Sequence, residues 1–192
     1  MASDPIGKLR RWLAAARAAG EPLAEAVALA TADGRGRPSV RYVLLKEVED
    51  GGVVFYTNTA SRKGRELRAN PRAALAAYWD ATGKQVRVEG RIEEVTSEEA
   101  DAYWAERPRP SQLASSASQQ SRAMQSRAEL VRAVRRLEER YRDRAVPRPR
   151  RWTGYRLLAE RVEFWTRHEP RLHHRELYVL RKGRWQRSLL QP

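Results

Sequence analysis

Short β-prone runs in which hydrophobic and polar residues alternate dominate the first half of the chain. Three of them are Ala26–Thr31, Val40–Glu47 and Val53–Asn58. The turn sequences Asp33-Gly34-Arg35-Gly36 and Asp50-Gly51-Gly52 separate these runs. Alternation with a period of two, interrupted by glycine-containing turns, predicts β-strands joined as antiparallel hairpins.

Further strands are expected later in the chain on the same grounds. They are Ala73–Trp79, Gln85–Val95 and Trp152–Trp165, followed by a hairpin over Leu177–Leu190 that turns at Lys182-Gly183. The alternation is clearest in the second of these strands, where Val86, Val88 and Ile92 share one face.

Helical spacing of apolar residues marks other segments. Helices are predicted over Lys8–Arg17, over Ser61–Asn70, from Thr96 through Trp104, and over Met124–Tyr141. Thr96-Ser97-Glu98-Glu99 is a capping box, in which two side chains satisfy free backbone amides at a helix start. Ser111–Ser121 is rich in serine, glutamine and alanine, and we interpret it as a long loop between two helices. An ordered loop of this length is typical of a functional segment.

Short antiparallel strands with helices inserted between them favour a mainly β, α+β fold built on an antiparallel β-barrel. A parallel sheet with crossover helices would alternate strand and helix throughout. With 192 residues the chain fits one domain. We expect a single domain over residues 1–192, with a first helix within 1–20, the main barrel strands within 26–95, a helical insertion within 96–145 and C-terminal strands within 152–192.

The net charge of +14 is concentrated in the last third of the chain, where residues 131–192 carry 18 Lys and Arg against 7 Asp and Glu. This favours a localised surface for anions, although an arginine-rich composition spread over solvated faces gives the same count. The absence of cysteine excludes disulfides, thiolate nucleophiles and zinc–thiolate or iron–sulfur sites. No apolar run of about 18 residues occurs, and we expect a cytoplasmic protein without a membrane partner.

Neither a Gly-x-Gly-x-x-Gly motif nor a Walker-type loop occurs, so side chains must hold any bound phosphate. Four clusters of basic, hydroxyl and aromatic residues are candidates. In the first, Arg41 to Lys46, alternation places Arg41, Val43 and Leu45 on one strand face, and Tyr42, Leu44 and Lys46 on the other. Such a strand can present two cations to one ligand at different depths, but an edge strand protected by charges has the same pattern.

The second cluster, Phe55 to Gly64, places Arg62 and Lys63 in the first turn of a helix. Cations there oppose the helix dipole unless an anion binds, so this cluster is a candidate phosphate site. The third cluster has Tyr103 and Arg107 four residues apart on one helix face, with Ser111 just beyond. These three groups suit a phosphate monoester, and a helix end that packs its aromatic residues has a similar composition.

The fourth cluster, Glu163 to Arg175, contains three residues that alternate along an extended segment and therefore point the same way: Arg171, His173 and Arg175. Its histidines do not favour a metal site. His173 and His174 face opposite sides of a strand, and no acidic or thiol partners cluster with them.

In this order the clusters closely resemble the pyridoxamine 5′-phosphate oxidase family, from about Ala26 to the end of the chain. The motifs that carry the resemblance are Arg41-x-Val43-Leu44-Leu45-Lys46, Phe55-Tyr56-Thr57-Asn58 with Ser61-Arg62-Lys63, Gln85-Val86, Arg107-Pro108-Arg109-x-Ser111-Gln112, Gln120-Ser121, Glu163-Phe164-Trp165 and Arg171-Leu172-His173-x-Arg175. The resemblance implies an FMN-binding split β-barrel that works as a homodimer, with each active site built from both subunits.

The resemblance also implies the reaction and its residues. A phosphorylated B6 vitamer, pyridoxamine or pyridoxine 5′-phosphate, is oxidised to pyridoxal 5′-phosphate, and O₂ is reduced to hydrogen peroxide. The implied FMN contacts are Arg41, Val43, Leu44, Lys46, Tyr56, Thr57, Arg62, Lys63, Gln85, Gln120, Ser121, Trp165 and Arg175. The implied substrate contacts are Lys46, Tyr103, Arg107 and Ser111 at the phosphate, with Arg171 and His173 as catalytic residues over the pyridine ring. Arg171 is expected to orient the reacting carbon, because a guanidinium stays protonated and is a poor base.

Several features on the substrate side depart from the family pattern. No basic arm precedes the first helix, His174 stands where an acidic residue is usual, Arg167 and His168 replace glycines, and Leu113–Ala117 replaces a sequence with glycine and an aromatic residue.

Three alternatives therefore remain open. One is a related flavin oxidase of secondary metabolism, similar to the phenazine-pathway members, and another is a split-barrel protein that binds flavin without oxidase activity. The third is a polyanion or nucleic-acid binder that uses the basic last third of the chain. Retention of all four phosphate contacts favours the vitamer. Nucleic acid is not favoured, because most aromatic residues near the basic segment occupy core-like strand positions.

Overall fold

The computed structural model describes residues 4–49 and 51–192; Asp50 of the predicted second turn lies outside them. The strands are β1 (Ala26–Ala32), β2 (Pro38–Glu49), β3 (Gly52–Asn58), β4 (Arg72–Trp79), β5 (Lys84–Glu94), β6 (Trp152–Thr166), β7 (His174–Arg181) and β8 (Arg184–Leu190). The helices are α1 (Pro5–Ala18), α2 (Arg62–Ala69), α3 (Ser97–Glu106), α4 (Arg109–Ala117) and α5 (Arg127–Arg140), with a 3₁₀ turn, η1, at Asp80–Thr82. Within the described residues, no helix is long and apolar enough to cross a membrane.

The chain divides into two compact units, and each is described by itself. The first unit comprises Met1–Phe55, Glu66–Glu93 and Tyr155–Pro192. The second unit comprises Tyr56–Arg65 and Glu94–Gly154.

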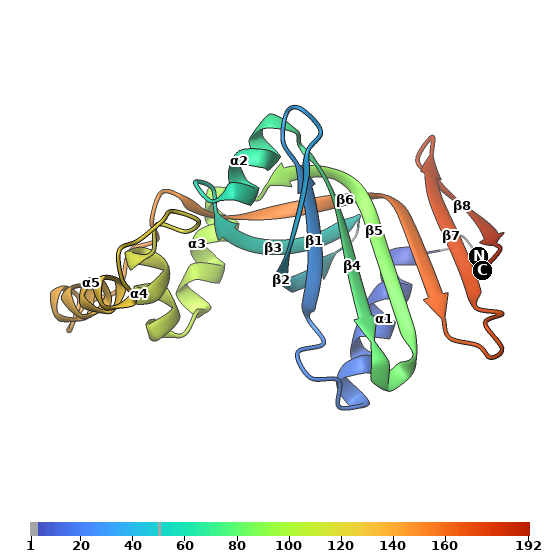
Figure 1. Ribbon diagram of the computed structural model, residues 1–192, viewed down its shortest axis with the longest axis horizontal. Helices are drawn as coiled ribbons and strands as arrows, with labels where there is room; N and C mark the ends of the chain where they lie inside the picture. The colour runs from blue at the N-terminus through green and yellow to red at the C-terminus, as the bar shows by residue number, and fades with distance from the viewer. Residues whose placement is uncertain (1–3, 50) are drawn as a thin grey trace. The chain divides into compact units, whose positions relative to one another are not determined.

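The first unit is built on a closed antiparallel barrel. The strand order is β3-β2-β1-β4-β5-β6, and an additional pairing of β3 with β6 closes the sheet (Figure 1). β1 pairs antiparallel with β2 and with β4, and β4 pairs antiparallel with β5. The predicted mainly β fold with inserted helices is confirmed. Each predicted strand is present to within a few residues at its ends.

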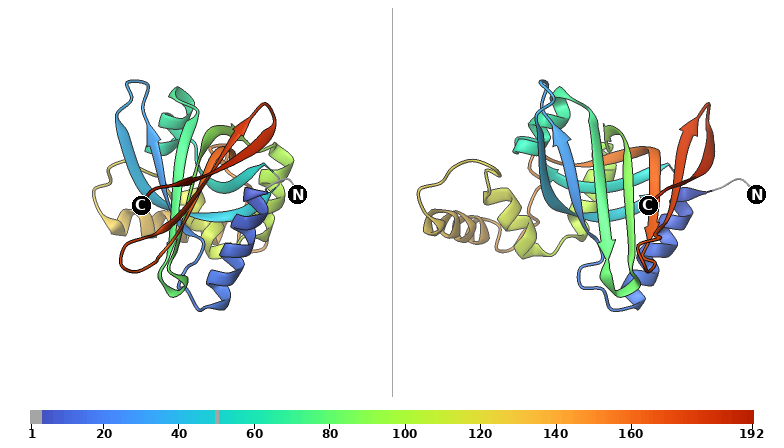
Figure 2. Two further views of the ribbon diagram at one scale, coloured as in Figure 1. Left: turned by 90° about the vertical axis from the view of Figure 1, so that its right-hand side faces the viewer. Right: turned by 45° about the vertical axis from the view of Figure 1, so that its right-hand side comes forward.

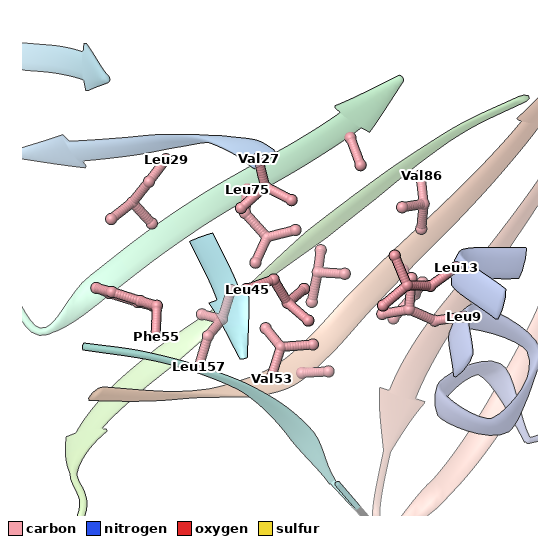
Figure 3. Close-up of a cluster of buried hydrophobic side chains, with 14 of the residues drawn as sticks. Leu9, Leu13, Val27, Leu29, Leu45, Val53, Phe55, Leu75, Val86 and Leu157 are labelled. Atoms are coloured by element: carbon pink, nitrogen blue, oxygen red, sulfur yellow. The ribbon is translucent and has the colours of Figure 1, made fainter. Parts of the chain in front are cut away.

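The barrel interior is filled by the hydrophobic residues of the alternating pattern. Leu29, Leu75 and Val86 are buried in one cluster with Phe55 and Leu157, and Figure 3 shows their side chains together. Helix α1 adds its own apolar face to this cluster through further leucines. It begins at Pro5 because the Asp4 side chain accepts a hydrogen bond from the Gly7 amide and proline suits the first helical turn.

Two strand glycines are required by close backbone approach. A Cβ on Gly90 of β5 would lie 1.8 Å from the carbonyl oxygen of Leu158 in β6. A Cβ on Gly52 of β3 would lie 2.3 Å from the carbonyl oxygen of Leu157. Both distances are far below van der Waals contact, so the barrel closes around β6 only where these positions lack a side chain.

Strands β7 and β8 form a hairpin that continues the sheet beyond β6, as predicted for the C-terminal segment (Figure 2). Glu176 in β7 connects this hairpin to helix α1. Its carboxylate accepts hydrogen bonds from the Lys8 ammonium of α1 and the Arg187 guanidinium of β8. Burial alone raises the pKa of Glu176, but the hydrogen bonds and charges of Lys8 and Arg187 outweigh burial and lower the pKa from its ordinary value of 4.5.

This ion pair predicts a specific acid dependence of stability. A carboxyl group with a lowered folded-state pKa stabilises the fold above its unfolded pKa, and this stabilisation is lost as the pH falls through the folded pKa. Replacing Lys8 by Met is therefore expected to flatten the decrease in the free energy of unfolding between about pH 5 and about pH 3. Urea denaturation across that range measures the slope.

The control for this prediction is Lys84→Met. Lys84 lies over the same Trp12 ring as Lys8, with the Nζ atoms 4.9 Å and 5.2 Å from the ring centroid. Lys84 is not among the groups that lower the pKa of Glu176. Equal slopes for the Lys8→Met protein and the wild type would refute the prediction.

The second unit is mainly helical and has its own core. Trp104, Leu113, Val146 and Trp152 are buried together. The Trp104 indole Nε1 donates to the Val146 carbonyl oxygen at 2.8 Å, which connects α3 to the segment before β6. The predicted capping box is confirmed, since the Thr96 hydroxyl accepts from the Glu99 amide and the Glu99 carboxylate accepts from the Thr96 amide.

The interpretation of Ser111–Ser121 as a loop is wrong over most of its length. Helix α4 occupies Arg109–Ala117, and only residues 118–121 are irregular. Serine is a weak helix former, so the sequence alone favours a loop. Tertiary contacts decide the outcome: Leu113 is buried in the core of the second unit, and the Gln112 side chain donates to the Trp104 carbonyl oxygen at 2.7 Å.

Candidate functional site

Arg41 lies on the inner face of β2 and is fixed by polar groups of the first unit. Its guanidinium donates to the Leu29 carbonyl oxygen at 3.1 Å and to the Thr31 hydroxyl at 2.6 Å. It also forms an ion pair of 3.1 Å with the buried carboxylate of Glu66 in α2. Because several partners orient this guanidinium, it is positioned before any ligand binds.

The motif Arg41 to Lys46 is divided between the two faces of β2. The half-buried Arg41 and Val43 share the inner face with Leu45, whereas Leu44 and Lys46 are exposed on the outer face. The predicted alternation is confirmed. Lys46 lies on the face opposite Arg41, as the alternation implies, at the irregular step in the β2–β3 pairing. That one ligand contacts both cations stays a prediction.

Two further candidate residues, Trp165 and Arg175, lie directly opposite each other on β6 and β7. The Glu163 carboxylate, which is 4% exposed, accepts a hydrogen bond of 2.9 Å from the Arg175 guanidinium and another from Arg87 of β5. Gln85 of β5 lies opposite Tyr78, whose ring centroid is 6.5 Å from that of Trp165.

His173 lies against this group and accepts a hydrogen bond on one ring nitrogen. Its ring centroid is 4.5 Å from that of Trp165, and its Nδ1 accepts a hydrogen bond from the His168 amide at 3.3 Å. A neutral His173 with Nδ1 as acceptor carries its proton on Nε2, so the ring presents a donor on its other side.

The expected alternation of Arg171, His173 and Arg175 along one extended segment is wrong. Strand β7 begins only at His174, and Arg171 lies in the turn before it with a φ of 79°. The left-handed backbone at Arg171 breaks the period of two, so its direction does not follow from that of Arg175. Within the part of the chain that the structure describes, no group of three or more potential metal ligands occurs.

In the second unit, three candidate residues far apart in the sequence form one hydrogen-bonded cluster. The Lys63 ammonium, on a residue only 8% exposed, donates to the Thr57 hydroxyl at 3.2 Å and to the Gln120 carboxamide oxygen at 3.3 Å. Thr57 also donates to Gln120 at 3.1 Å. As predicted, Arg62 and Lys63 occupy the first turn of α2, and Ser121 follows Gln120 with a φ of 71°. A buried ammonium beside a hydroxyl and a carboxamide oxygen suits an anionic ligand.

An aromatic stack and Arg107 lie beside this cluster. The Tyr56 ring stacks on Tyr103 at 4.0 Å and on Trp152 at 5.1 Å. The Arg107 guanidinium lies 4.9 Å from the Trp152 ring centroid. Arg107 is the C-cap of α3, directly after the last helical residue Glu106, and has extended backbone angles. Its guanidinium still lies near the Tyr103 phenol, as the four-residue spacing predicted. Burial lowers the pKa of Arg107, and the nearby Tyr103 phenol counteracts part of this shift.

Several of these residues line a hollow of about 270 Å³ within the second unit, and Lys63 and Tyr103 are not among its lining residues. Its lining includes Tyr56, Thr57, Asn58, Arg107, Ser115, Ser118 and Gln120. Four predicted ligands therefore line one cavity, and the predicted contact Ser111 is not among its lining residues. The chemistry of the lining is that of an anion site with an aromatic wall.

Ser115 is a residue that the sequence analysis missed. Its hydroxyl accepts a hydrogen bond of 3.1 Å from the Arg107 guanidinium. The signal was present, because Ser111 and Ser115 are four residues apart and share one face of a helix. The interpretation of this segment as a loop concealed that spacing.

Known families match nearly the whole chain. The family described as pyridoxamine 5′-phosphate oxidase matches residues 13–141. The region described as the pyridoxine 5′-phosphate oxidase C-terminal dimerisation region matches residues 152–192.

Curated relatives are similar over nearly the whole of this chain. A pyridoxine/pyridoxamine 5′-phosphate oxidase of Anaeromyxobacter dehalogenans is 50% identical over 191 residues, covering 100% of this chain and 96% of that protein. A protein of the same name from Rubrobacter xylanophilus is 51% identical over 189 residues, covering 98% of this chain and 87% of that protein.

Solved structures share the fold. PhzG from Burkholderia lata, in complex with tetrahydrophenazine-1-carboxylic acid, is 39% identical with a TM-score of 0.95, covering 99% of this chain and 93% of that one. A pyridoxamine 5′-phosphate oxidase-related, FMN-binding protein from Nostoc punctiforme is 20% identical with a TM-score of 0.79, covering 100% of both chains, and shows the split-barrel fold alone. From these matches, together with the barrel and its motifs, the chain belongs to the pyridoxamine 5′-phosphate oxidase family.

Proposed function

We propose that this protein is an FMN-dependent oxidase that converts pyridoxamine or pyridoxine 5′-phosphate to pyridoxal 5′-phosphate and reduces O₂ to hydrogen peroxide. Family membership and the names of relatives about half identical to it support this reaction. The observation that carries the substrate class is the hollow of the second unit, where Arg107 lies beside an aromatic wall. A phosphate monoester on an aromatic ring needs both features.

The donor groups present in each unit fit FMN, an anionic cofactor with a planar ring. The buried Lys63 ammonium, oriented by the Thr57 hydroxyl and the Gln120 carboxamide oxygen, is a preformed cation for phosphate oxygens. In the first unit, Arg41 is a fixed cation that Glu66 already orients. The remaining proposed contacts are Val43, Leu44, Lys46, Tyr56, Arg62, Gln85, Ser121, Trp165 and Arg175. When bound, FMN would supply the two-electron redox chemistry that connects oxidation of the substrate to reduction of O₂.

The protein's own contribution to the reaction is binding and orientation. Arg107, Tyr103, Ser111 and Lys46 are proposed to hold the substrate phosphate, which fixes the position of the ring. His173 presents its Nε2 proton as a hydrogen-bond donor, since its Nδ1 is occupied by the His168 amide. Arg171 is proposed to orient the reacting carbon, because a guanidinium remains protonated throughout the reaction.

We also propose a homodimer with active sites at the interface. The C-terminal match to a dimerisation region supports dimer formation. The outer face of β2 supports it as well, because Val40, Tyr42 and Leu44 are exposed in a row and Tyr42 is 77% exposed. Lys46 shares this outer face, so it is placed to serve a site other than the one that Arg41 serves in the same subunit.

A second candidate function comes from the similarity to the PhzG structure, which contains tetrahydrophenazine-1-carboxylic acid. A tricyclic carboxylic acid carries no phosphate, so an oxidase of such a substrate does not require a tetrahedral anion site. The positively charged, hydroxyl-lined hollow therefore favours the vitamer over the phenazine precursor.

The experiment is a turnover assay on the purified protein after loading with FMN. Pyridoxamine and pyridoxine 5′-phosphate are each expected to yield pyridoxal 5′-phosphate with an equal amount of hydrogen peroxide. Protein that binds FMN but oxidises neither vitamer would overturn the proposed reaction. Oxidation of tetrahydrophenazine-1-carboxylic acid by that same protein would support the second candidate. Salt-sensitive retention of DNA by colourless protein would support a polyanion binder.

A further inference from the structure

We propose that Ser115 determines the preference of this site for a phosphate monoester, by holding Arg107 in place and by adding one hydrogen-bond donor for the phosphate. The inference rests on the proposed function and extends it to a residue outside the family motifs. Its basis is the contact between Ser115 and Arg107 within the second unit.

Ser115 and Trp152 restrain Arg107 from two sides. The guanidinium lies over the Trp152 ring at 4.9 Å, and its Nη2 donates to the Ser115 hydroxyl oxygen at 3.1 Å. The Arg107 Nε is buried and has no hydrogen-bond partner among the described residues. A guanidinium with an unpaired buried N–H gains most from an anion that accepts that hydrogen bond, so the group is oriented for a ligand that supplies oxygen atoms.

The direction of the hydrogen bond assigns the second role of Ser115. The Ser115 oxygen accepts a hydrogen bond from Arg107. A guanidinium has no acceptor atom, so the Ser115 proton is available to another group. Ser115 and Ser118 both line the hollow, and with Ser111 they follow a helical spacing of four and three residues. The Ser115 hydroxyl therefore provides a donor on the side of the cavity where Arg107 provides a positive charge.

A phosphate monoester uses this arrangement better than a carboxylate does. It has three terminal oxygens arranged tetrahedrally, and a carboxylate has two oxygens in one plane. A guanidinium fork can satisfy both carboxylate oxygens alone, whereas a phosphate retains an oxygen for a hydroxyl donor. Removing the Ser115 hydroxyl is thus expected to weaken the binding of phosphorylated ligands and to leave the binding of unphosphorylated ligands unchanged.

The test compares Ser115→Ala with Ser115→Thr and Ser116→Ala in the FMN-loaded protein. Losing a hydrogen bond to a charged group is expected to raise the KM for pyridoxamine 5′-phosphate about tenfold in Ser115→Ala, with kcat within about twofold. Inhibition by inorganic phosphate is expected to weaken by a similar factor, and FMN affinity is expected to stay unchanged. Ser115→Thr keeps the hydroxyl and is expected to retain the wild-type KM.

Ser116→Ala is the matched control. The Ser116 hydroxyl is buried without a hydrogen-bond partner in the part of the chain described, so its removal is expected to leave the KM unchanged. A Ser115→Ala protein with wild-type KM and wild-type phosphate inhibition would overturn the inference. A raised KM in both alanine variants would overturn it too, since any serine of α4 would then have the same effect.

Equilibrium binding separates this inference from the proposed function. The Kd for inorganic phosphate, measured by titration calorimetry on the FMN-loaded protein, requires no turnover. Weaker phosphate binding by Ser115→Ala supports the inference, whether or not the wild type oxidises the vitamers. A wild type that oxidises neither vitamer overturns the proposed function and leaves the inference standing. If Ser115→Ala binds phosphate as the wild type does and the wild type oxidises the vitamers, the inference is overturned and the proposed function stands.

Discussion

Replacing Arg107 by alanine is expected to lower kcat/KM for pyridoxamine 5′-phosphate by at least about 100-fold. Arg107 is the cation of the hollow in the second unit, and its guanidinium is held between the Trp152 ring and the Ser115 hydroxyl. Its removal takes the positive charge out of the hollow, whose other lining residues are aromatic or neutral. Steady-state kinetics with both vitamers, together with a measurement of bound FMN, tests this expectation.

Two arginine variants show whether the loss of activity in Arg107→Ala comes from the lost charge, from the lost planar shape of the guanidinium or from a less stable fold. Arg107→Lys keeps a positive charge but loses the planar fork that stacks on Trp152, so it is expected to recover only part of the activity. Arg109 donates to the carbonyl oxygens of Tyr141 and Arg144, and Arg109→Ala is expected to leave KM unchanged. Full activity of Arg107→Ala would show that the substrate phosphate binds elsewhere.

Replacing Glu163 by alanine is expected to destabilise the fold by about 2–4 kcal/mol. The carboxylate is 4% exposed and is paired with Arg87 and Arg175, whose side chains are 43% and 25% exposed. Because water can reach both guanidinium groups, the loss is expected to be smaller than for a fully buried pair. Urea denaturation at a fixed protein concentration measures it.

Two further variants identify the cause of this loss. Glu163→Gln keeps the hydrogen-bonding shape and removes the charge, so an intermediate loss is expected. Glu160→Ala removes the partner of Arg72 from an exposed ion pair, and its cost is expected to stay below about 1 kcal/mol. If Glu163→Ala is no less stable than Glu160→Ala, the shared carboxylate does not hold the strands β5, β6 and β7 together.

The strands and most helices could be predicted from the sequence because each depends on local residues. The alternation of Arg41, Val43 and Leu45 predicted the inner face of β2, and Thr96 with Glu99 predicted the start of α3. Helix α4 was missed because its serines favour a loop by themselves. Its stability comes from Leu113 and Gln112, whose contacts with the Trp104 region are invisible in the local sequence.

The candidate site shows the same limit. The types and spacing of the basic and hydroxyl residues predicted them as anion ligands. The partners that orient them were not predicted, because Glu66 is 25 residues from Arg41, and Gln120 is 57 residues from Lys63. The position of Arg171 was also missed, since a left-handed residue in a turn ends the alternation that the sequence pattern assumes.

The glycines at positions 52 and 90 limit how the substrate range of this enzyme can be changed by directed evolution. Each faces a carbonyl oxygen of β6, so even a methyl group there displaces the backbone of the neighbouring strand. Most substitutions at either position are therefore expected to be lost from a random library through misfolding, whatever their effect on catalysis. Libraries that keep both glycines and vary the serines of α4 place the diversity on a helix face that lines the proposed binding cavity.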